Sequence, residues 1–454
     1  MTYGLVVHCL LGIAALEGEL MYRLQRRFLP LTLVALFILL GLGPSVAQAQ
    51  DEEIELRVWD QFTDANSAVV DSMYQAFMDA NPNITITREA ISSDQMRDTI
   101  NTAISSGTGP DIINYDAGPG YAGVLADAGL LVPLDDLADQ AGLRDRIAPY
   151  ALQGTTIDGT LYGLPTTVDL IGVYSNNTLM AEAGLTMPET LADLVTFCGA
   201  AADAGYVPMA LSANPGWQTF HQFSMVVNAM LGPEAVGQLL IENQGDWNSP
   251  AVVQAIDAFF VQLRDAGCFS DDVNALTYDD AAALFYSGQS LLLPTGSWMI
   301  ANIEANMPDS DVGFHQFPMI DGALCRCWVS GVGSAYFVSA QSEQQEAAKM
   351  LLEFLFSPES AARWVSEANI FMPVQLDALT LDLSPLASSV VQTLQSGISG
   401  ETQFGWNVDV LAPPAFNDMM MNGFQAMLSG DKTAEEQAAD LQAAWQEGMG
   451  TPVP

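Results

Sequence analysis

The chain has 454 residues, of which 50% are hydrophobic, and it carries 54 acidic against 13 basic residues, a formal net charge of −41. This length allows two or three domains with real cores. The charge excludes a nucleic-acid partner, because no basic surface is available to replace phosphate counterions. The acids are scattered along the chain, which is typical of a well-solvated surface; a cationic ligand is the alternative explanation.

The N-terminal segment is predicted to be a secretory signal peptide. Arginines at positions 23, 26 and 27 precede an apolar run over 28–42, and Ala47-Gln48-Ala49 offers small residues for cleavage after Ala49. The run has about 15 residues, fewer than the roughly 20 that span a bilayer, so a retained anchor is the alternative. No cysteine stands directly after this run, where a lipid anchor would be attached. We therefore expect residues 1–49 to be removed, with Met21 as a candidate true start, and the protein to be periplasmic or secreted.

The first part of the mature chain predicts alternating strands and helices. The segments ELRVW (55–59) and NITIT (83–87) alternate polar and apolar residues, as strands do. A helix with Val69, Met73 and Phe77 on one face ends at Asn81-Pro82, and a polar helix over 93–105 leads to a buried strand at Ile112-Ile113. This β-α-β-α-β order predicts a parallel sheet flanked by helices.

The remainder of the chain predicts a second region of mixed structure. Gly163-Leu164-Pro165 separates two extended segments, of which the second, 170–174, is apolar throughout. Residues 189–305 are expected to be mostly helical, with breaks that include Pro294. A second α/β element is expected from Trp328, and a Met-rich helix from about Asp418.

Four cysteines lie beyond the predicted cleavage site. An exported chain meets an oxidising compartment, so disulfides are allowed, and four cysteines permit three pairings. Cys198 with Cys268 is the preferred bridge, because each lies at or near the end of a helical pattern. Cys325 and Cys327 either join each other or stay reduced. A zinc site is a weaker alternative, since a single C-x-C lacks a second pair or nearby histidines.

Several motifs, in order, give the chain a family resemblance. It resembles the extracellular solute-binding proteins of ABC importers, specifically family 1, which includes the maltose-binding and related sugar-binding proteins. The similarity covers nearly all of 51–454. The motifs are the strand ending in Trp59, Asn81-Pro82-Asn83-Ile84, Ser106-Gly107-x-Gly109-Pro110-Asp111-Ile112, Gly129-Leu130-Leu131-x-Pro133-Leu134, Tyr162-Gly163-Leu164-Pro165, Ala183-Gly184-Leu185, Pro188-Glu189-Thr190, Ala283-Leu284-Phe285-x-x-Gly288, Gly296-Ser297-Trp298 and Phe354-Leu355-Phe356-Ser357-Pro358-Glu359.

The resemblance implies an α/β, two-lobe periplasmic-binding-protein fold of a type II-like kind. Each lobe is expected to be a mixed sheet flanked by helices, with the ligand cleft between the lobes. Gly331 and Gly333 are able to absorb dihedral change at a hinge. By analogy the N-terminal lobe comprises 51–167 plus 331–378 and the C-terminal lobe 168–330 plus 379–454, with crossing segments near 166–169, 328–331 and 374–379.

Sugar recognition uses flat aromatic side chains against the apolar face of a ring, and planar acids or amides that hydrogen-bond neighbouring hydroxyls. Some positions have a second explanation: Trp59 also suits a core, and Asp116 also suits a helix cap. Asp169 stands between apolar residues, where an unpaired buried carboxylate is costly, which favours function. The resemblance places the candidate ligand contacts at Trp59, Asp60, Gln61, Tyr115, Asp116, Asp169, Trp298 and Gly331, and Trp217, Trp328 and Trp406 are added as aromatic walls.

The sequence contains few motifs that are typical of an enzyme. His221 and His315, the histidines beyond the predicted signal peptide, stand in no metal-binding spacing, and no G-x-S-x-G motif occurs. We therefore expect neither an enzyme nor a cofactor nor a metal. A glycosidase that uses a pair of carboxylates stays as an alternative.

The primary hypothesis is a monomeric receptor that captures a sugar or small oligosaccharide by lobe closure and delivers it to the transmembrane subunits of an ABC permease. Its rival keeps the receptor and makes the cargo a cation such as a polyamine. A phosphorylated sugar is disfavoured, because few arginines are available to hold phosphate.

Overall fold

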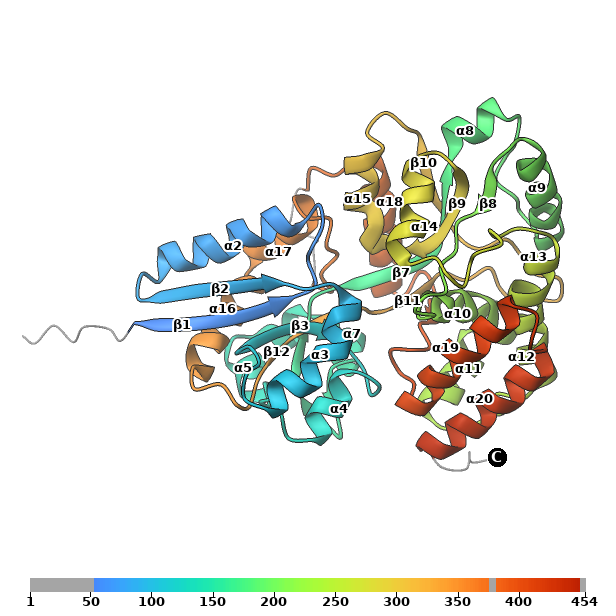
Figure 1. The fold of residues 1–454 in the computed structure, drawn as a ribbon. Coiled ribbons are helices and arrows are strands. Elements are labelled where there is room, and N and C mark those ends of the chain that lie inside the picture. The colour runs from blue at the N-terminus through green and yellow to red at the C-terminus, as the bar shows by residue number, and fades with distance from the viewer. Residues whose placement is uncertain (1–52, 375–380, 450–454) are drawn as a thin grey trace, which may run out of the picture. The chain divides into compact units, whose positions relative to one another are not determined.

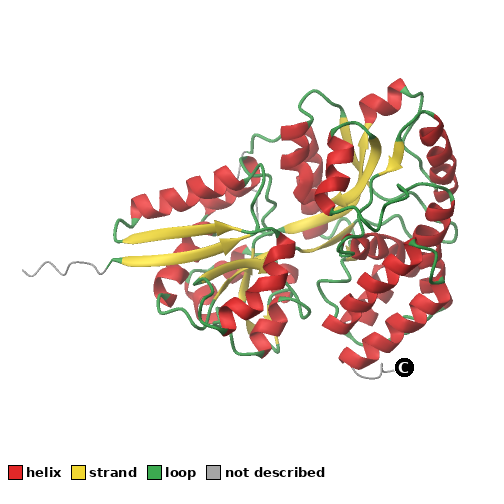
Figure 2. Ribbon diagram, viewed as in Figure 1, coloured by secondary structure: helices red, strands yellow, loops and turns green. Residues whose placement is uncertain are grey.

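The computed structural model describes residues 53–374 and 381–449. The segment from Glu53 onward forms one compact unit. The predicted signal peptide, and all of the third expected crossing segment except Val374, lie outside the described residues. Within them, two mixed β-sheets are covered by helices (Figure 1, Figure 2).

The first sheet has five strands in the order β2-β1-β3-β12-β6. β1 runs parallel to β2 and to β3, as the β-α-β-α-β order predicts, while β12 runs antiparallel to β3 and to β6. The strands are β1 (Ile54–Asp60), β2 (Ile84–Ala90), β3 (Ile112–Asp116), β6 (Gly163–Pro165) and β12 (Ser334–Val338).

Helices and a small hairpin complete this part of the fold. α16 packs against β1, β12 and α2. We call the first sheet with these elements the first lobe. They are α2 (Ser67–Ala80), α3 (Ser93–Ser105), α4 (Ala122–Asp127), α5 (Asp135–Gln140), α6 (Leu143–Arg146), α7 (Pro149–Gln153), the hairpin of β4 (Thr156–Ile157) and β5 (Thr160–Leu161), α16 (Gln345–Leu355) and α17 (Pro358–Ser366).

The second sheet is built around the long strand β7. Its order is β13-β11-β7-β9-β8, and β10 pairs with the far end of β7. The strands are β7 (Val168–Asn176), β8 (Val207–Met209), β9 (Ser290–Gly296), β10 (Val312–His315), β11 (Val329–Val332) and β13 (Gly405–Trp406).

We call the second sheet with its helices the second lobe. A turn of π-helix (Asp257–Val261) lies between α12 and α13, and a turn of 3-10 helix (Ser297–Met299) follows β9. The helices are α8 (Asn177–Glu182), α9 (Leu191–Asp203), α10 (Gln218–Leu231), α11 (Pro233–Ile241), α12 (Pro250–Ile256), α13 (Gln262–Asp265), α14 (Tyr278–Tyr286), α15 (Ile300–Asn306), α18 (Pro385–Ile398), α19 (Pro414–Leu428) and α20 (Ala434–Met449).

The region 189–305 is less helical than the sequence suggests, because it contains β8 and β9. Pro294, interpreted as a break, lies inside β9 opposite Val173 of β7. Its carbonyl oxygen accepts a hydrogen bond from the side chain of Gln218 at 3.1 Å and another from that of Gln222 at 2.6 Å. A short apolar run such as SLLLPTG has no periodicity that separates a buried strand from a helix.

The chain passes between the sheets at two neighbouring places. β6 ends at Pro165 in the first sheet and β7 begins at Val168 in the second; β11 ends at Val332 in the second sheet and β12 begins at Ser334 in the first. The two passages are side by side, since Val332 pairs with Val168 in the β11–β7 ladder. The largest core cluster also includes residues of both lobes.

Candidate ligand-binding cleft

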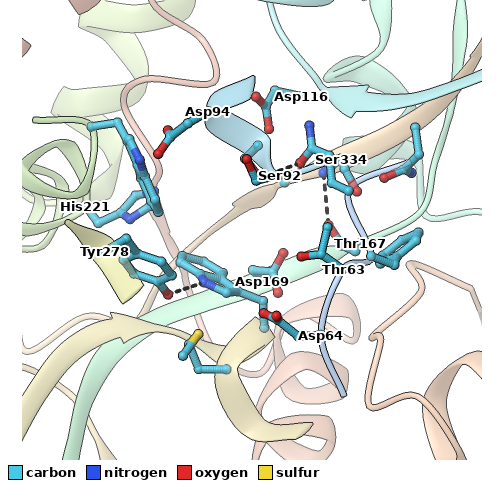
Figure 3. A pocket seen from close by; sticks show the side chains of 18 of the residues that line it. Thr63, Asp64, Ser92, Asp94, Asp116, Thr167, Asp169, His221, Tyr278 and Ser334 are labelled. Carbon is cyan, nitrogen blue, oxygen red and sulfur yellow. Dashed lines mark hydrogen bonds between the residues drawn. The ribbon is translucent and has the colours of Figure 1, made fainter. Parts of the chain in front are cut away.

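A cleft with a cavity volume of about 300 Å³ lies where the two sheets approach each other. Its lining comes from both lobes: the loop after β1, α3 and β3 on one side, and β7, α10, α14 and the 3-10 turn after β9 on the other. Figure 3 shows carboxylate and aromatic side chains from these elements converging on the cleft. The volume is at the lower end of the range for small-molecule sites.

Strand alternation decides which of the predicted residues reach this cleft. Successive side chains of β3 point to opposite faces, so Asn114 and Asp116 line the cleft while Tyr115 does not. Tyr115 instead is buried against Tyr121, with 6.4 Å between the ring centroids. Of the predicted contacts, the structure places Gln61, Asp116, Asp169, Trp217, Trp298 and Gly331 in the lining.

Trp59 and Asp60 are corrections to the predicted site. Trp59 packs against a hydrophobic cluster of the first lobe. Asp60 is fully buried and forms a bidentate ion pair with Arg88. The Arg88 Nε lies 2.7 Å from Oδ2 of Asp60, and Nη2 lies 2.8 Å from Oδ1. Burial raises its pKa, and the Arg88 guanidinium opposes that shift. Its carboxylate also accepts from the backbone N–H of Phe62 at 3.1 Å, so Asp60 positions the loop that enters the cleft.

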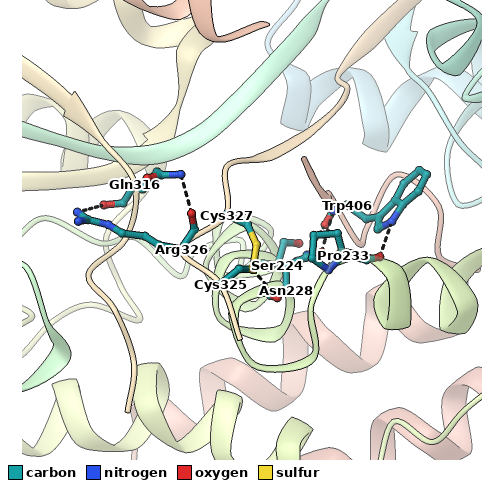
Figure 4. The surroundings of a disulfide bond; sticks show 8 residues. All are labelled: Ser224, Asn228, Pro233, Gln316, Cys325, Arg326, Cys327 and Trp406. Atoms are coloured by element: carbon teal, nitrogen blue, oxygen red, sulfur yellow. Dashed lines mark hydrogen bonds between the residues drawn. A yellow bond between two sulfur atoms is a disulfide. The ribbon is translucent and has the colours of Figure 1, made fainter. Parts of the chain in front are cut away.

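Trp328 and Trp406 also lie outside the cleft lining. Trp328 stacks on Phe314 with ring centroids 5.3 Å apart. Trp406 donates from Nε1 to the carbonyl oxygen of Pro233 at 2.9 Å, and its backbone N–H donates to Asn228 (Figure 4). Both tryptophans therefore pack within the second lobe. Trp328 lies in the loop before β11 and Trp406 in the two-residue strand β13, and segments this irregular or short have no periodicity that shows the direction of a side chain.

Four rings of the second lobe form a continuous aromatic wall along the cleft. We use this name for Trp217, His221, Tyr278 and Trp298. Trp217 lies 4.8 Å from Tyr278 and 5.5 Å from His221, and His221 lies 5.1 Å from Trp298, between ring centroids. The indole Nε1 of Trp298 donates to the Tyr278 hydroxyl at 2.7 Å. Burial, with a smaller effect of Arg97, lowers the pKa of His221 to about 3, so the imidazole is neutral.

Arg97 of α3 is the one arginine or lysine among the described residues of the lining. Its Nε donates to Oδ2 of Asp116 at 2.7 Å, and its guanidinium carbon lies 5.2 Å from the ring centroids of both Tyr121 and Trp217. Across the cleft, Tyr121 donates to Oδ2 of Asp409 at 3.3 Å. Burial raises the pKa of Asp409 to about 6, although Arg97 counteracts the effect.

Asp169 is placed by its pairing in the second sheet. β11 opposes it with Gly331, so no side chain covers the carboxylate from that strand. Its Oδ1 accepts from the hydroxyl of Ser297 at 2.9 Å. Burial raises the pKa of Asp169 to about 6, and the hydroxyl bonds from Ser297 and Thr167 reduce the shift.

Sequence reasoning missed much of the lining. Arg97 had a usable signal, because it is one of few basic residues and lies on a polar helix that precedes β3. His221 and Tyr278 gave none, since a single polar or aromatic residue in a helix is most often structural. The missed residues with polar or aromatic side chains include Asp64, Asp94, Arg97, Tyr121, His221, Tyr278, Asp279, Asn302, Asn369, Asn407 and Asp409.

Two disulfides lie in the second lobe, away from the cleft lining. Cys198 of α9 is joined to Cys268, which follows α13. Cys325 is joined to Cys327 in the loop before β11, and the Sγ of Cys325 lies 3.4 Å from the carbonyl oxygen of Asn228 (Figure 4). In the part of the chain that the structure describes, no group of three or more His, Cys, Asp or Glu residues is arranged to hold a metal ion.

Membrane-spanning potential is limited to one bent helix pair. Among residues 53–374 and 381–449, no helix alone is both long and apolar enough to cross a bilayer. α10 and α11 satisfy the criterion only when taken together, and they meet at an angle of 117°.

Comparison with known proteins gives a consistent result. A family model described as "Bacterial extracellular solute-binding protein" matches residues 59–362. A multiple sugar-binding protein of Streptococcus mutans is 22% identical over 60% of the chain, and the match spans 64% of that protein, slightly under two thirds of its length.

Solved structures share the fold. A chain from a study of xylan utilization by Caldanaerobius polysaccharolyticus has a TM-score of 0.78 and 21% identity, covering 86% of this chain and 99% of that one. A chitin oligosaccharide binding protein has a TM-score of 0.75 and 23% identity, covering 87% and 99%. At these identities the likeness establishes the two-lobe fold.

Proposed function

Because the chain belongs to the bacterial extracellular solute-binding proteins, we propose that it captures a sugar or small oligosaccharide between its lobes and delivers it to an ABC permease. The observation that supports this most strongly is the aromatic wall facing carboxylates and amides across a cleft of about 300 Å³. Rings bind the apolar face of a sugar, and planar oxygens and amides bind its hydroxyls in pairs. The names of the multiple sugar-binding and chitin oligosaccharide binding relatives agree with this cargo.

Contacts between the lobes supply the mechanism of capture. Tyr121 of the first lobe bonds to Asp409 of the second, and the backbone N–H of Ala65 donates to Oδ1 of Asn302 on α15 at 3.2 Å. Such contacts form only when the lobes are close. A cargo that touches both lobes makes its full set of contacts only in the closed form. It therefore stabilises the closed form relative to the open one and shifts the population toward closure.

The hinge is proposed to lie at the two passages between the sheets. The two passages comprise residues 166–169 and 328–333. Within the second, Gly331 and Gly333 allow the change in backbone dihedral angles that closure needs. Accordingly, we propose lobe boundaries of 51–167 plus 333–378 and 168–332 plus 379–454, which moves the expected boundary at 330/331 by two residues because β11 ends at Val332. The protein then acts as a monomeric receptor outside the cytoplasm after signal-peptide cleavage, and not as an enzyme.

The test is calorimetry of the purified mature protein against a broad saccharide panel, paired with small-angle scattering with and without each saccharide. Native mass spectrometry of freshly purified protein would identify a retained cargo. We expect at least one saccharide to bind and to reduce the radius of gyration. Absence of both binding and compaction for every saccharide would refute the proposal, and release of cleaved products on incubation with oligosaccharides would support a glycosidase instead.

A further inference from the structure

The cleft holds more negative charge than its one cation balances. Of the described residues, six aspartates and one arginine line it, and His221 is neutral. Arg97 is already engaged, because its Nε bonds to Asp116 and its Nη1 lies 3.8 Å from Oδ1 of Asp94. Among the described residues, no Lys, Arg or His forms an ion pair with the other four aspartates, which are Asp64, Asp169, Asp279 and Asp409.

The charges are unevenly distributed over the cleft. Figure 3 shows Asp94 and Asp116 on one side, and Asp64, Asp169 and Tyr278 on the other. Arg97 belongs to the first side, where it also acts on Asp409. On the second side Asp169 is 7% exposed, and the forces on its carboxyl come from burial and two hydroxyls, with no cation among them. A desolvated carboxylate without a cation is costly unless the ligand supplies one.

Unpartnered buried atoms form a second, independent observation. Within the described part of the chain, Oδ1 of Asn114 and Oδ1 of Asp409 are buried in the cleft without a hydrogen-bond donor. The buried Nε2 of Gln61 likewise has no acceptor, and Nδ1 of His221 has no partner. Because buried polar groups are nearly always satisfied, a ligand is expected to supply these partners.

These atoms also limit the chemistry of the ligand. A protonated polyamine carries N–H donors and no acceptor, so it would leave Nε2 of Gln61 unsatisfied. A neutral sugar supplies donors and acceptors but no positive charge for Asp169. A phosphorylated sugar would bring negative charge toward four aspartates that have no ion-pair partner among the described residues, while Arg97 is already engaged by Asp116.

We propose that the cargo is an amino sugar, with its hydroxyls on the unpartnered atoms and its protonated amine beside Asp169. This inference rests on the proposed function and specifies its substrate class. The aromatic wall suits both parts of such a ligand: ring faces pack on Trp298 and Tyr278, and indole and phenol faces attract a cation. Asp64 and Asp279 strengthen the negative potential on the same side.

The experiment measures binding of matched pairs that differ only in one amine. Calorimetry at about pH 7 compares glucosamine with glucose, galactosamine with galactose, mannosamine with mannose, and the β-1,4-linked glucosamine dimer with cellobiose; N-acetylated forms add a neutral control at the same carbon. We expect one amino form to bind at least about tenfold more tightly than its parent. Raising the ionic strength from about 0.05 M to about 0.5 M should weaken that binding several-fold and leave the parent unaffected.

Variants locate the amine. Asp169→Asn keeps an oxygen for Ser297 and removes the charge, so the preference for the amino form should fall to within about twofold. The matched control is Asp203→Asn, at the exposed end of α9 outside the cleft lining, which makes the same change in net charge. If Asp169→Asn is at least as thermally stable as Asp203→Asn, the loss of preference is not caused by misfolding.

The possible outcomes distinguish failure of the amino-sugar assignment from failure of the proposed sugar-receptor function. Tight binding of a neutral saccharide with no amine preference would overturn the amino-sugar assignment and leave the sugar receptor standing. Binding of putrescine with failure of every sugar would replace the sugar by a polyamine and refute both. Failure of every saccharide, amino or neutral, would also refute the proposed function.

Discussion

Tyr121 and Asp409 lie on different lobes and are joined by a hydrogen bond of 3.3 Å from the tyrosine hydroxyl to Oδ2. Tyr121→Phe removes the donor and leaves a buried carboxylate with less support, which should cost the closed form about 1 kcal/mol. We expect cargo affinity to fall about fivefold, with a larger radius of gyration at subsaturating cargo. Tyr150→Phe, which removes a hydroxyl from α7 outside the cleft lining, is the control. Equal affinity in both variants would contradict a role in closure.

Gly118 should control how closely the lobes approach. A Cβ at this position would overlap the backbone carbonyl of Val410, and Gly118 has a φ of +101°. Gly118→Ala should therefore hold the lobes apart and reduce cargo affinity more than tenfold, because only backbone movement relieves the overlap. Gly129→Ala is matched for left-handed backbone, with a φ of +69° and open space around it. A scattering profile identical for the two variants would count against this account.

The aromatic wall should carry much of the affinity. Trp298→Ala removes a ring from the cleft and the donor to Tyr278, which should raise the Kd by roughly thirtyfold, or about 2 kcal/mol. Trp328→Phe changes an aromatic side chain that stacks on Phe314 outside the lining, and it should leave the Kd within about twofold. Calorimetry with the cargo retained on purification measures both; a larger loss for Trp328 would place the cargo elsewhere.

The two disulfides should differ in their contribution to stability. Cys198 and Cys268 are 70 positions apart, whereas Cys325 and Cys327 are two apart. Loop-closure entropy gives about 4 kcal/mol for the long loop and about 1.5 kcal/mol for the short one. Replacing Cys198 and Cys268 together by Ser should therefore lower the Tm more than the same change at Cys325 and Cys327. Calorimetric unfolding of both double variants decides the order.

Acid should stabilise the ligand-free protein through Asp169 and Asp409. Burial raises the pKa of each to about 6, against about 3.9 in an unfolded chain. A carboxyl with a raised pKa binds its proton more tightly in the folded protein than in the unfolded chain. Its contribution to the free energy of unfolding is therefore fully present below about pH 4 and is lost as the pH rises through about 6. The difference amounts to at most about 3 kcal/mol per group.

Asp169→Asn isolates one of these two groups. The amide never ionises, so the variant should unfold at a higher temperature than the wild type at about pH 7.5 and at nearly the same temperature at about pH 4. Asp203→Asn, whose carboxyl is exposed, should follow the wild type throughout. A constant gap between Asp169→Asn and wild type over this range would show that ionisation of Asp169 does not destabilise the fold.

The β-α-β-α-β order of the first lobe could be read from the sequence, because amphipathic periodicity and proline stops are local properties. The expected helix over 93–105 matches α3, the alternating segment at 55–59 lies in β1, and that at 83–87 overlaps β2 from Ile84 onward. The same reasoning missed β8 and β9, since a short buried apolar run has no period to identify it. Family motifs supplied the two-lobe fold that the local patterns do not contain.

By itself, the sequence determined the first three strands with the helices between them and the acidic, aromatic character of the chain, because composition and period are carried by consecutive residues. Only the tertiary structure decided which side chains share the cleft. Asp116 enters it and Tyr115 does not, because alternation sends neighbours to opposite faces, and Asp409 meets Tyr121 only because two lobes fold against each other. Contacts between residues 288 positions apart depend on the packing of both lobes, and no local pattern encodes them.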